Sequence, residues 1–261
     1  MRYIVMLSGG IGSYVAALRT VEAHGAEHVV CLFADVLGED EDTYRFIDDA
    51  VNNLGCQYVR LVDGRDIWQV FKDRRFLGNS RQANCSHELK QKPAAAWLKD
   101  NGDPENDVIV IGIDWTETHR QRAVINAYAP YRVEFPLCEK PYMTKAQMLD
   151  LARYDGIEPP RLYGMGFSHN NCGGGCVRAG QAQFAHLLRV RPEVFAQWEA
   201  NERDVAEYLD KDVAILSEVV NGEKRLLPLT VLRKRIESQP SLLDEDDWGG
   251  CGCFVAYEVT A

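Results

Sequence analysis

The stretch Ser8–Ser13, with the sequence Ser-Gly-Gly-Ile-Gly-Ser, has the composition of an anion-binding turn. An apolar run over residues 3–7 precedes it and a helical pattern follows it, so the sequence predicts a strand, a glycine turn and a helix. The first amides of a helix lack partners within the helix and lie at the positive end of its dipole, which makes phosphate their usual ligand. Glycine permits close approach of a ligand, and serine adds hydroxyl donors. The candidate ligand-binding residues are Ser8, Gly9, Gly10, Gly12 and Ser13.

Two better-known glycine motifs do not describe this turn. It lacks the Gly-Lys-Ser/Thr ending of a Walker A loop and the full G-x-G-x-x-G spacing of a dinucleotide-binding turn. An ordinary glycine-rich turn between strand and helix is the alternative interpretation. The position after the first strand favours ligand binding, because an open α/β sheet binds its ligands at the carboxyl ends of its strands.

The second group of residues that can do chemistry is a set of thiols. The eight cysteines are Cys31, Cys56, Cys85, Cys138, Cys172, Cys176, Cys251 and Cys253. Cys172 and Cys176 form a C-x3-C pair in a glycine loop, and Cys251 and Cys253 flank one glycine. Zinc and iron–sulfur centres both prefer such thiolate ligands, and in a chain of this size metal chemistry is favoured over disulfides. A structural zinc site with four thiolates is the alternative to an iron–sulfur centre.

Apolar runs and helical patterns alternate along the first half of the chain, and these elements must position the turn and the thiols. Strands are expected at residues 3–7, 28–34, 57–61, 108–111 and 132–135. Helices are expected at residues 13–24, 42–54, 65–71, 87–99, 145–154, 181–190 and 192–209. The alternation predicts an α/β fold with a doubly wound parallel sheet and right-handed crossovers. Thr144 is the expected N-cap of its helix, and Asn221-Gly222 the turn of a hairpin.

The chain changes character near Pro159-Pro160, beyond which it is rich in glycine, asparagine and cysteine. We therefore expect two parts: a nucleotide-binding domain over residues 1–158 and a helical, cysteine-bearing C-terminal region over residues 159–261.

Charge and hydropathy limit the class of partner. The 261 residues carry a formal net charge of −10, which argues against a broad nucleic-acid-binding surface. A local basic groove stays open, since Lys90 and Lys92 fit an anion contact as well as a solvated surface. Apolar runs stay shorter than the roughly 18 residues of a membrane span, and the N-terminus reads as a strand rather than a signal peptide. We expect a cytoplasmic protein without a membrane partner.

Acidic residues follow the second predicted strand. Asp35 ends that strand beside the glycine turn, where a carboxylate can hold a ribose hydroxyl or a magnesium ion. The run from Glu39 to Asp42 is instead expected to be a solvated acidic loop.

Three segments in order resemble one superfamily. The turn resembles the SGGxDS motif of PP-loop ATP pyrophosphatases, with Gly12 at the acidic position. Residues 33–46 resemble the segment FADTG-E-x-x-E-T-Y-x-F of phosphoadenylylsulfate (PAPS) reductases, and residues 85–93 resemble their C-x-x-x-x-K-x-x-P segment. Over roughly residues 3–150, more than half of its length, the chain is similar to the PP-loop, adenine nucleotide alpha-hydrolase-like superfamily.

This resemblance implies ATP or another adenine nucleotide, with its phosphates over the turn and Mg2+ beside them. The backbone near Phe33 would hold the base, Asp35 would lie near the ribose or the metal, and Gly112 would be a further contact. Arg120 would stabilise charge on the α-phosphate, because a guanidinium matches phosphate geometry. Gly12 in place of the usual acid leaves the magnesium arrangement open.

The superfamily also implies a reaction. A substrate oxygen attacks the α-phosphorus, pyrophosphate leaves, and a sulfur nucleophile then displaces the adenylated oxygen. We expect a sulfurtransferase with a [4Fe–4S] cluster held by Cys85, Cys172 and Cys176, because the segment around Cys85 matches cluster ligands of adenylylsulfate reductases. Cys251 or Cys253 would be the fourth ligand or a mobile nucleophile.

The partners then expected are an adenine nucleotide, a sulfur donor and an acceptor that is either a small molecule or a locally gripped nucleic acid. A homodimer is left open. A PAPS or adenylylsulfate reductase is the second hypothesis, and a non-catalytic nucleotide-binding regulator with structural zinc is the third.

Overall fold

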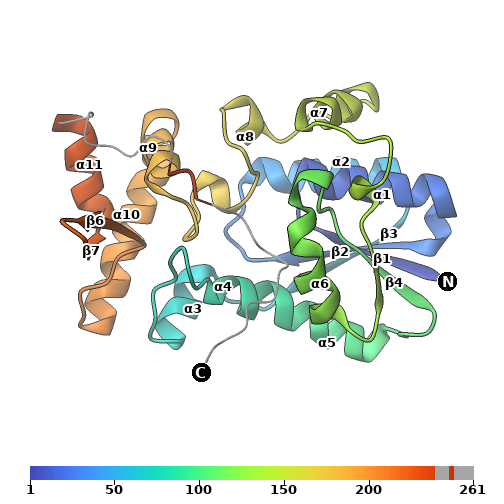
Figure 1. Ribbon diagram of the computed structural model, residues 1–261, viewed down its shortest axis with the longest axis horizontal. Coiled ribbons are helices and arrows are strands. Elements are labelled where there is room, and N and C mark those ends of the chain that lie inside the picture. The colour runs from blue at the N-terminus through green and yellow to red at the C-terminus, as the bar shows by residue number, and fades with distance from the viewer. Residues whose placement is uncertain (239–246, 250–261) are drawn as a thin grey trace.

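A computed structural model describes residues 1–238 and 247–249 of the chain. Its centre is a five-stranded sheet in the order β3-β2-β1-β4-β5, in which every neighbouring pair is parallel (Figure 1). The strands are β1 (Arg2–Leu7), β2 (Val29–Asp35), β3 (Gln57–Val62), β4 (Asp107–Val110) and β5 (Arg132–Glu134). The predicted α/β fold and all five predicted strands are confirmed, with bounds within two residues.

The strand order creates a switch point beside β1. The chain passes from β1 to β2 and β3, and then returns to β4 on the other side of β1. The carboxyl ends of β1 and β4 are therefore neighbours, with Val5 opposite Val110. Ligands of open α/β sheets bind at this kind of position, so the fold places the segments after β1 and β4 at one crevice.

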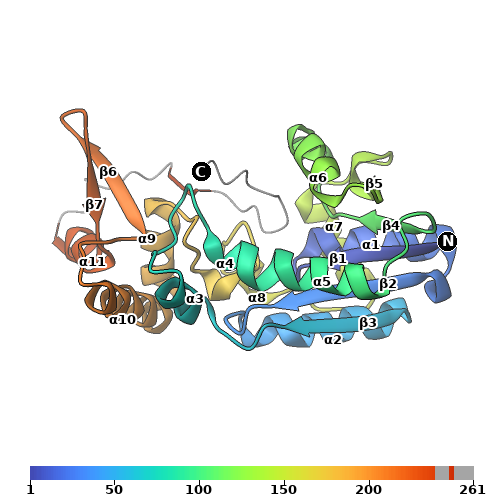
Figure 2. The same cartoon turned by 90° about the horizontal axis from the view of Figure 1, so that it is seen from below.

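Helices cover both faces of the sheet (Figure 2). One face packs against α1 (Ile11–His24), α2 (Glu41–Leu54) and α7 (Lys145–Tyr154), and the other against α5 (Lys92–Asn101) and α6 (Gln121–Tyr128). Successive residues of β1 alternate between the two cores: Val5 joins the first, and Ile4 and Met6 join the second. Such burial on both faces explains why the parallel strands are continuous apolar runs.

The helical run before β4 is longer than expected. It comprises α4 (Asn84–Ser86), a π-helical turn (His87–Gln91) and α5, in place of one helix over residues 87–99. The short α3 (Ile67–Asp73) precedes it. The expected cap of α7 is confirmed, because the side chains of Thr144 and Gln147 form a capping box. Brief 3-10 segments connect the remaining elements: Ala26–His28, Trp115–Arg120, Pro136–Cys138 and Cys172–Gly174.

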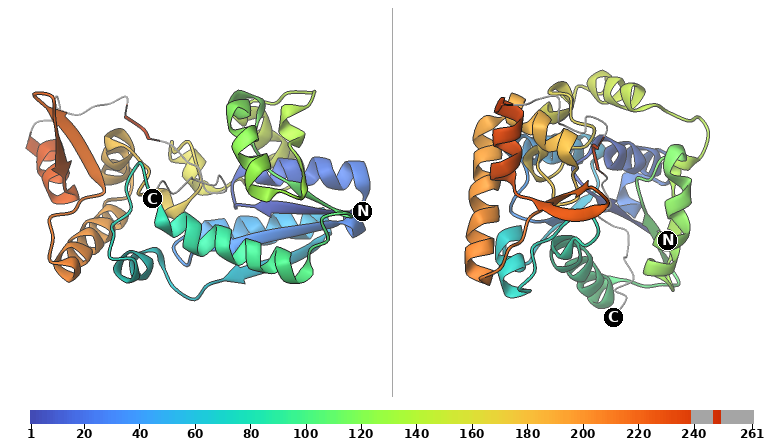
Figure 3. Two further views of the ribbon diagram at one scale, coloured as in Figure 1. Left: turned by 60° about the horizontal axis from the view of Figure 1, so that its bottom comes forward. Right: turned by 60° about the vertical axis from the view of Figure 1, so that its left-hand side comes forward.

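The elements of the C-terminal part are α8 (Arg161–Gly164), α9 (Gln181–Val190), α10 (Pro192–Leu209), β6 (Leu216–Val220), β7 (Glu223–Leu227) and α11 (Leu229–Ser238). The elements from α9 onward lie at the end of the molecule away from the N-terminus, and α8 lies between them and the sheet (Figure 3). The predicted bounds of α9 and α10 are confirmed, as is the hairpin turning at Asn221-Gly222. The helix α11 was not expected from the sequence.

One apolar cluster spans the expected domain boundary at residue 158. It joins Phe71 and Leu89 from the first part to Phe184 and Trp198 from the second. The division into two domains stays a prediction. Within the described ranges, no helix combines the length and the apolar character needed to cross a membrane.

Glu202 of α10 gives this C-terminal part a pH-dependent stability. Its buried carboxylate accepts hydrogen bonds from the amides of Ile215, at 2.9 Å, and Leu229, at 2.6 Å. Burial raises the pKa of Glu202 from 4.5 to about 6, against the opposing effect of these amides. The protonated carboxyl is thus favoured in the folded protein. Its contribution to the free energy of unfolding is complete below pH 4.5 and is lost as the pH rises through 6.

We expect the Glu202 contribution to the unfolding free energy to fall by ~2 kcal/mol across this window. Urea unfolding at several pH values measures it as the difference between the wild type and Glu202→Gln, in which the fall is absent. Glu207→Gln, on the exposed side of α10, is the control, and its unfolding free energy should depend on pH as that of the wild type does. Parallel pH profiles of wild type and Glu202→Gln would contradict the assignment.

Candidate functional site

A cavity of about 160 Å3 opens at the carboxyl ends of β1 and β4, where the fold places a ligand crevice. The predicted site residues in its wall are Ser8, Gly10, Gly12, Ser13, Gly112 and Arg120. Residues from α7 and the C-terminal part complete it, among them Lys145, Tyr163, His169 and Asn170. The fold thus brings the predicted phosphate turn together with Gly112 and Arg120, which lie about a hundred residues further along the chain.

Hydrogen bonds of Ser13 hold the turn in shape. The Ser13 hydroxyl accepts from the Ser8 amide at 3.1 Å and donates to the Gly10 carbonyl at 2.8 Å. The hydroxyls of Ser8 and Ser13 are also 3.1 Å apart. Gly9 has a φ of +78°, in the left-handed region that favours glycine. Because its hydroxyl bonds to other residues of the turn, Ser13 holds the predicted phosphate turn in shape from within.

Ser13→Ala should therefore distort the turn without disturbing the core. Removing the hydroxyl leaves the Ser8 amide and the Gly10 carbonyl without this partner, and we expect ATP to bind about tenfold more weakly, equivalent to one lost hydrogen bond of ~1.4 kcal/mol. Equilibrium dialysis with ATP measures the change. Ser238→Ala, at the exposed end of α11, is the control. Equal affinities of Ser13→Ala and the wild type would contradict this role of the hydroxyl.

Gly12 and Gly112 mark a close approach of two backbones. A Cβ atom on Gly112 would lie 2.9 Å from the Cα of Ser13 and 3.0 Å from the carbonyl carbon of Gly12. A Cβ on Gly12 would lie 3.3 Å from the Gly112 carbonyl oxygen. The position at which the superfamily motif carries an acid is thus one where a side chain would press against backbone.

Tyr163 reaches the turn from the C-terminal part. Its hydroxyl accepts a hydrogen bond from the Ile11 amide, in the first turn of α1, at 3.1 Å. Lys145 lies over the Tyr163 ring, with Nζ 6.0 Å from the ring centroid, and donates to the Ser168 carbonyl at 2.5 Å. A cation and a phenol therefore flank the helix end at which an anion would bind.

Arg120 lies in the cavity wall but is not a free cation. Its guanidinium forms an ion pair with Glu117 of the same 3-10 turn, which also lines the cavity. The turn begins at Asp114, whose carboxylate caps the Thr116 amide at 2.8 Å. The expected contact of Arg120 with an α-phosphate stays a prediction, and it requires the guanidinium to serve both carboxylate and phosphate or to exchange one for the other.

Phe33 and Asp35 lie outside the residues that line the cavity. Phe33 is buried in the core, with its ring edge-on to Tyr44. The buried Asp35 carboxylate accepts from the Leu37 amide at 2.8 Å, from the Tyr44 hydroxyl at 2.8 Å and from Arg60 Nε at 3.0 Å. The predicted base and ribose contacts of this strand end stay predictions, and the Asp35 side chain serves the loop after β2.

The three described cysteines of the predicted metal site line a second, smaller cavity of about 30 Å3. Cys85 comes from α4, and Cys172 and Cys176 come from the glycine loop. The hydrogen bond with Cys176, burial and the nearby Glu39 carboxylate together raise the pKa of Cys172. This environment favours the protonated thiol over the nucleophilic thiolate. The fold therefore brings together thiols that the sequence separates by almost ninety residues.

Lys90 borders both cavities. Its Nζ lies 3.3 Å from Glu39 Oε1, and both side chains are buried. Glu39 Oε2 in turn accepts a hydrogen bond from the Cys172 amide at 2.6 Å. From the sequence, Lys90 was either a solvated surface residue or an anion contact. The structure places it between the phosphate turn and the thiols.

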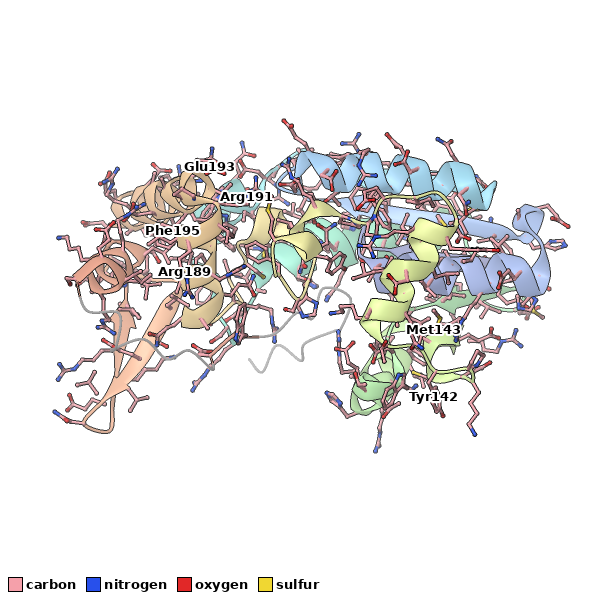
Figure 4. The ribbon with its side chains drawn as sticks, turned by 90° about the horizontal axis from the view of Figure 1, so that it is seen from above. Tyr142, Met143, Arg189, Arg191, Glu193 and Phe195 are labelled. Carbon is pink, nitrogen blue, oxygen red and sulfur yellow. The ribbon has the colours of Figure 1, made fainter. Side chains whose placement is uncertain are left out.

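The expectation of a solvated acidic loop over Glu39 to Asp42 is wrong for its first two residues. The Glu39 and Asp40 side chains are 0% and 2% exposed. Asp40 forms ion pairs with Arg161 and Arg191. Arg191 lies at the junction of α9 and α10 (Figure 4). Burial acts to raise the pKa of Asp40, but hydrogen bonds from Arg161, the Asp42 amide and Arg191 lower it below its usual range. Partners from the C-terminal part, invisible in the local sequence, bury these acids.

Cys251 and Cys253 lie outside the described residues, so their predicted roles as ligand or nucleophile stay predictions. Across residues 1–238 and 247–249, no three His, Cys, Asp or Glu side chains are placed to hold a metal ion. The sequence analysis also missed Tyr163, Lys145 and Asn170 as cavity residues. The local sequence carries no signal for the first two, whereas Asn170 and Asn171 next to the thiol loop were a compositional hint.

The sequence matches no family model and no curated protein. Its structure is similar to that of a PAPS reductase from Candida auris, solved as a phosphate complex, with 14% identity and a TM-score of 0.48 over 66% of this chain and 81% of that chain. It is also similar to an NH3-dependent NAD synthetase from Campylobacter jejuni, with 16% identity and a TM-score of 0.41 over 84% of this chain and 90% of that chain. It is similar as well to an NMN synthetase from Francisella tularensis, with 14% identity and a TM-score of 0.39 over 60% of this chain and 62% of that chain. A PAPS reductase is thus among the solved structures to which this chain is similar.

Proposed function

We propose that this chain is an ATP-dependent PP-loop enzyme that adenylates a substrate oxygen and replaces that oxygen with sulfur. The observation that supports the proposal most strongly is the arrangement of two cavities that share Lys90. One contains the phosphate turn at the switch point of the sheet, and the other contains three thiols. A nucleotide site directly beside a thiol site is what a reaction needs if it first activates an oxygen and then exchanges it for sulfur.

In the first step a substrate oxygen forms a bond to the α-phosphorus of ATP, and the bond from that phosphorus to pyrophosphate breaks. The amides at the start of α1 and the cations Lys90, Lys145 and Arg120 would stabilise the charge that develops on the phosphates. In the second step sulfide from a sulfide donor bonds to the activated carbon, and AMP leaves with the original oxygen. Neither step changes the oxidation state of that carbon.

The thiols have the donor chemistry of an iron–sulfur centre, because three cysteines share one cavity and thiolates are the ordinary ligands of such clusters, but their side chains must move together before they can hold one. Cys85, Cys172 and Cys176 would hold it, with Cys251 or Cys253 as a further ligand. When bound, the cluster would supply an iron to which sulfide can attach. Zinc suits the same thiolates and is the alternative occupant. The protonated state favoured at Cys172 implies that this thiol loses its proton when a metal binds.

Analysis of full-length protein purified without oxygen tests the metal assignment. We expect about four iron atoms and four sulfides per chain for a [4Fe–4S] cluster, with broad visible absorption. Cys176→Ala should lose most of the iron. Cys138→Ala is the matched control, since Cys138 donates to the Ile113 carbonyl away from the thiol cavity. Stoichiometric zinc without iron would contradict the cluster.

Nucleotide turnover tests the reaction class independently. Incubation with ATP, Mg2+, a sulfide donor and candidate acceptors should release pyrophosphate and AMP. Release of sulfite from PAPS or adenylylsulfate, without pyrophosphate from ATP, would instead support the reductase hypothesis. Nucleotide binding without any turnover in either assay would leave the regulator as the better interpretation.

A further inference from the structure

Asn170 connects the phosphate turn to the thiol loop. Its side chain is 4% exposed and lies in the wall of the nucleotide cavity. The amide nitrogen donates to the Gly9 carbonyl at 2.8 Å and to the Thr43 hydroxyl at 3.0 Å. Gly9 belongs to the phosphate turn and Thr43 to the first turn of α2. One side chain from the C-terminal part is therefore bonded to the carbonyl of Gly9, the residue of the turn with a positive φ.

The other end of the same amide group has no partner. In the part of the chain that the structure describes, no group donates to Asn170 Oδ1, although this atom is buried. Buried acceptors are almost always satisfied, so an orphan marks a place where a rearrangement or a ligand can supply a hydrogen bond. Its position beside the phosphate turn makes nucleotide binding the event most able to do so.

Cys172 lies two residues beyond Asn170 and is held by a second link. Its amide donates to Glu39, which pairs with Lys90 of the nucleotide cavity. Tyr163 begins the same segment and bonds to Ile11 in the phosphate turn. We call residues 163–172 the strap. The strap thus contacts the phosphate turn through Tyr163 and Asn170 and ends at a thiol.

We propose that Asn170 is a positioning residue through which a nucleotide on the phosphate turn changes the reactivity of the Cys172 thiol. This inference rests on the proposed function, because it takes an adenine nucleotide as the ligand of the turn. Phosphates bound at the turn displace or reorient the Gly9 carbonyl. The Asn170 side chain moves with this carbonyl, because its amide nitrogen donates to it as well as to the Thr43 hydroxyl. The short chain from Asn170 to Cys172 then moves the thiol relative to Cys176 and Glu39. Binding of the nucleotide for the adenylation step is thereby coupled to the exposure of the Cys172 thiol.

The experiment measures the alkylation rate of each cysteine by iodoacetamide and peptide mass spectrometry, with and without saturating ATP and Mg2+, in full-length protein freed of metal by a chelator so that Cys172 is a free thiol. Equilibrium dialysis measures ATP binding of the same samples. In the wild type we expect ATP to change the Cys172 rate about fivefold or more, the lower end of ordinary coupling between sites. In Asn170→Ala and Asn170→Leu, compared with the wild type at ATP concentrations that give equal occupancy by dialysis, the change should disappear. Asn126→Ala, on an exposed position of α6, should behave as the wild type.

Each outcome decides the matter. A wild type that does not bind ATP would overturn the proposed function and the inference together. ATP binding without an effect on Cys172 would overturn the inference alone, as would an ATP effect that persists in both Asn170 variants. Thr43→Val guards against misfolding of those variants, because it removes one partner of Asn170 at nearly constant volume and should reduce the ATP effect. An unchanged ATP effect in a folded Thr43→Val would also count against the proposal.

Discussion

Lys90→Met is expected to destabilise the protein by about 3–5 kcal/mol, the usual result of removing one partner of a buried ion pair. The Glu39 carboxylate is fully buried and its Oε1 lies 3.3 Å from Lys90 Nζ. Methionine fills most of the space of the lysine stem but leaves the negative charge without this cation. Urea unfolding followed by circular dichroism measures the loss.

Two further variants identify the cause. Lys90→Met combined with Glu39→Gln removes both charges and keeps an oxygen to accept from the Cys172 amide, so a large part of the lost stability should return. Lys92→Met is the matched control, because half-exposed Lys92 shares Glu88 with Arg74, and we expect it to cost less than about 1 kcal/mol. A double variant no more stable than Lys90→Met would show that lost packing, rather than the buried charge, causes the effect.

Gly112→Ala is expected to cost about 1–3 kcal/mol of stability, because the new Cβ would overlap backbone that cannot rotate away. The atoms it meets are the Cα of Ser13 at 2.9 Å and the carbonyl group of Gly12 at 3.0 Å. Since relief requires β4 and the phosphate turn to separate, we also expect ATP affinity to fall at least about tenfold, or ~1.4 kcal/mol. Urea unfolding and equilibrium dialysis measure the two effects.

Gly164→Ala provides the comparison, since a Cβ there meets no atom within 4 Å. It should change stability by less than about 0.5 kcal/mol and leave ATP binding unaltered. Gly12→Asp, which restores the acid of the superfamily motif, should weaken ATP binding rather than strengthen it, because its Cβ presses on the Gly112 carbonyl. Tighter binding by Gly12→Asp would show that the backbone yields at this contact.

Much of the fold was predictable because the signals are local. The strand, glycine turn and helix of residues 2–24 follow from an apolar run, small residues and helical periodicity. The capping box of Thr144 and the turn at Asn221-Gly222 depend on residues within a few positions of each other. The π-helical turn over His87–Gln91 was not predictable in this way, because Glu88, Leu89 and Lys90 are buried and Leu89 packs in a core with distant elements.

The candidate site likewise has features that the local sequence predicts and features that depend on distant contacts. The sequence by itself determined the phosphate turn, the thiols of the glycine loop and the parallel sheet that carries the turn, because each depends on residue types at fixed short spacing. Only the tertiary structure decided that Glu39 is buried against Lys90, that Gly12 meets Gly112, and that Tyr163 and Asn170 reach the turn. Those contacts join residues 51 to 161 positions apart. They form only where folding buries the two groups together, since a buried polar or charged group costs free energy unless it is paired, and no local pattern records which distant group will be the partner.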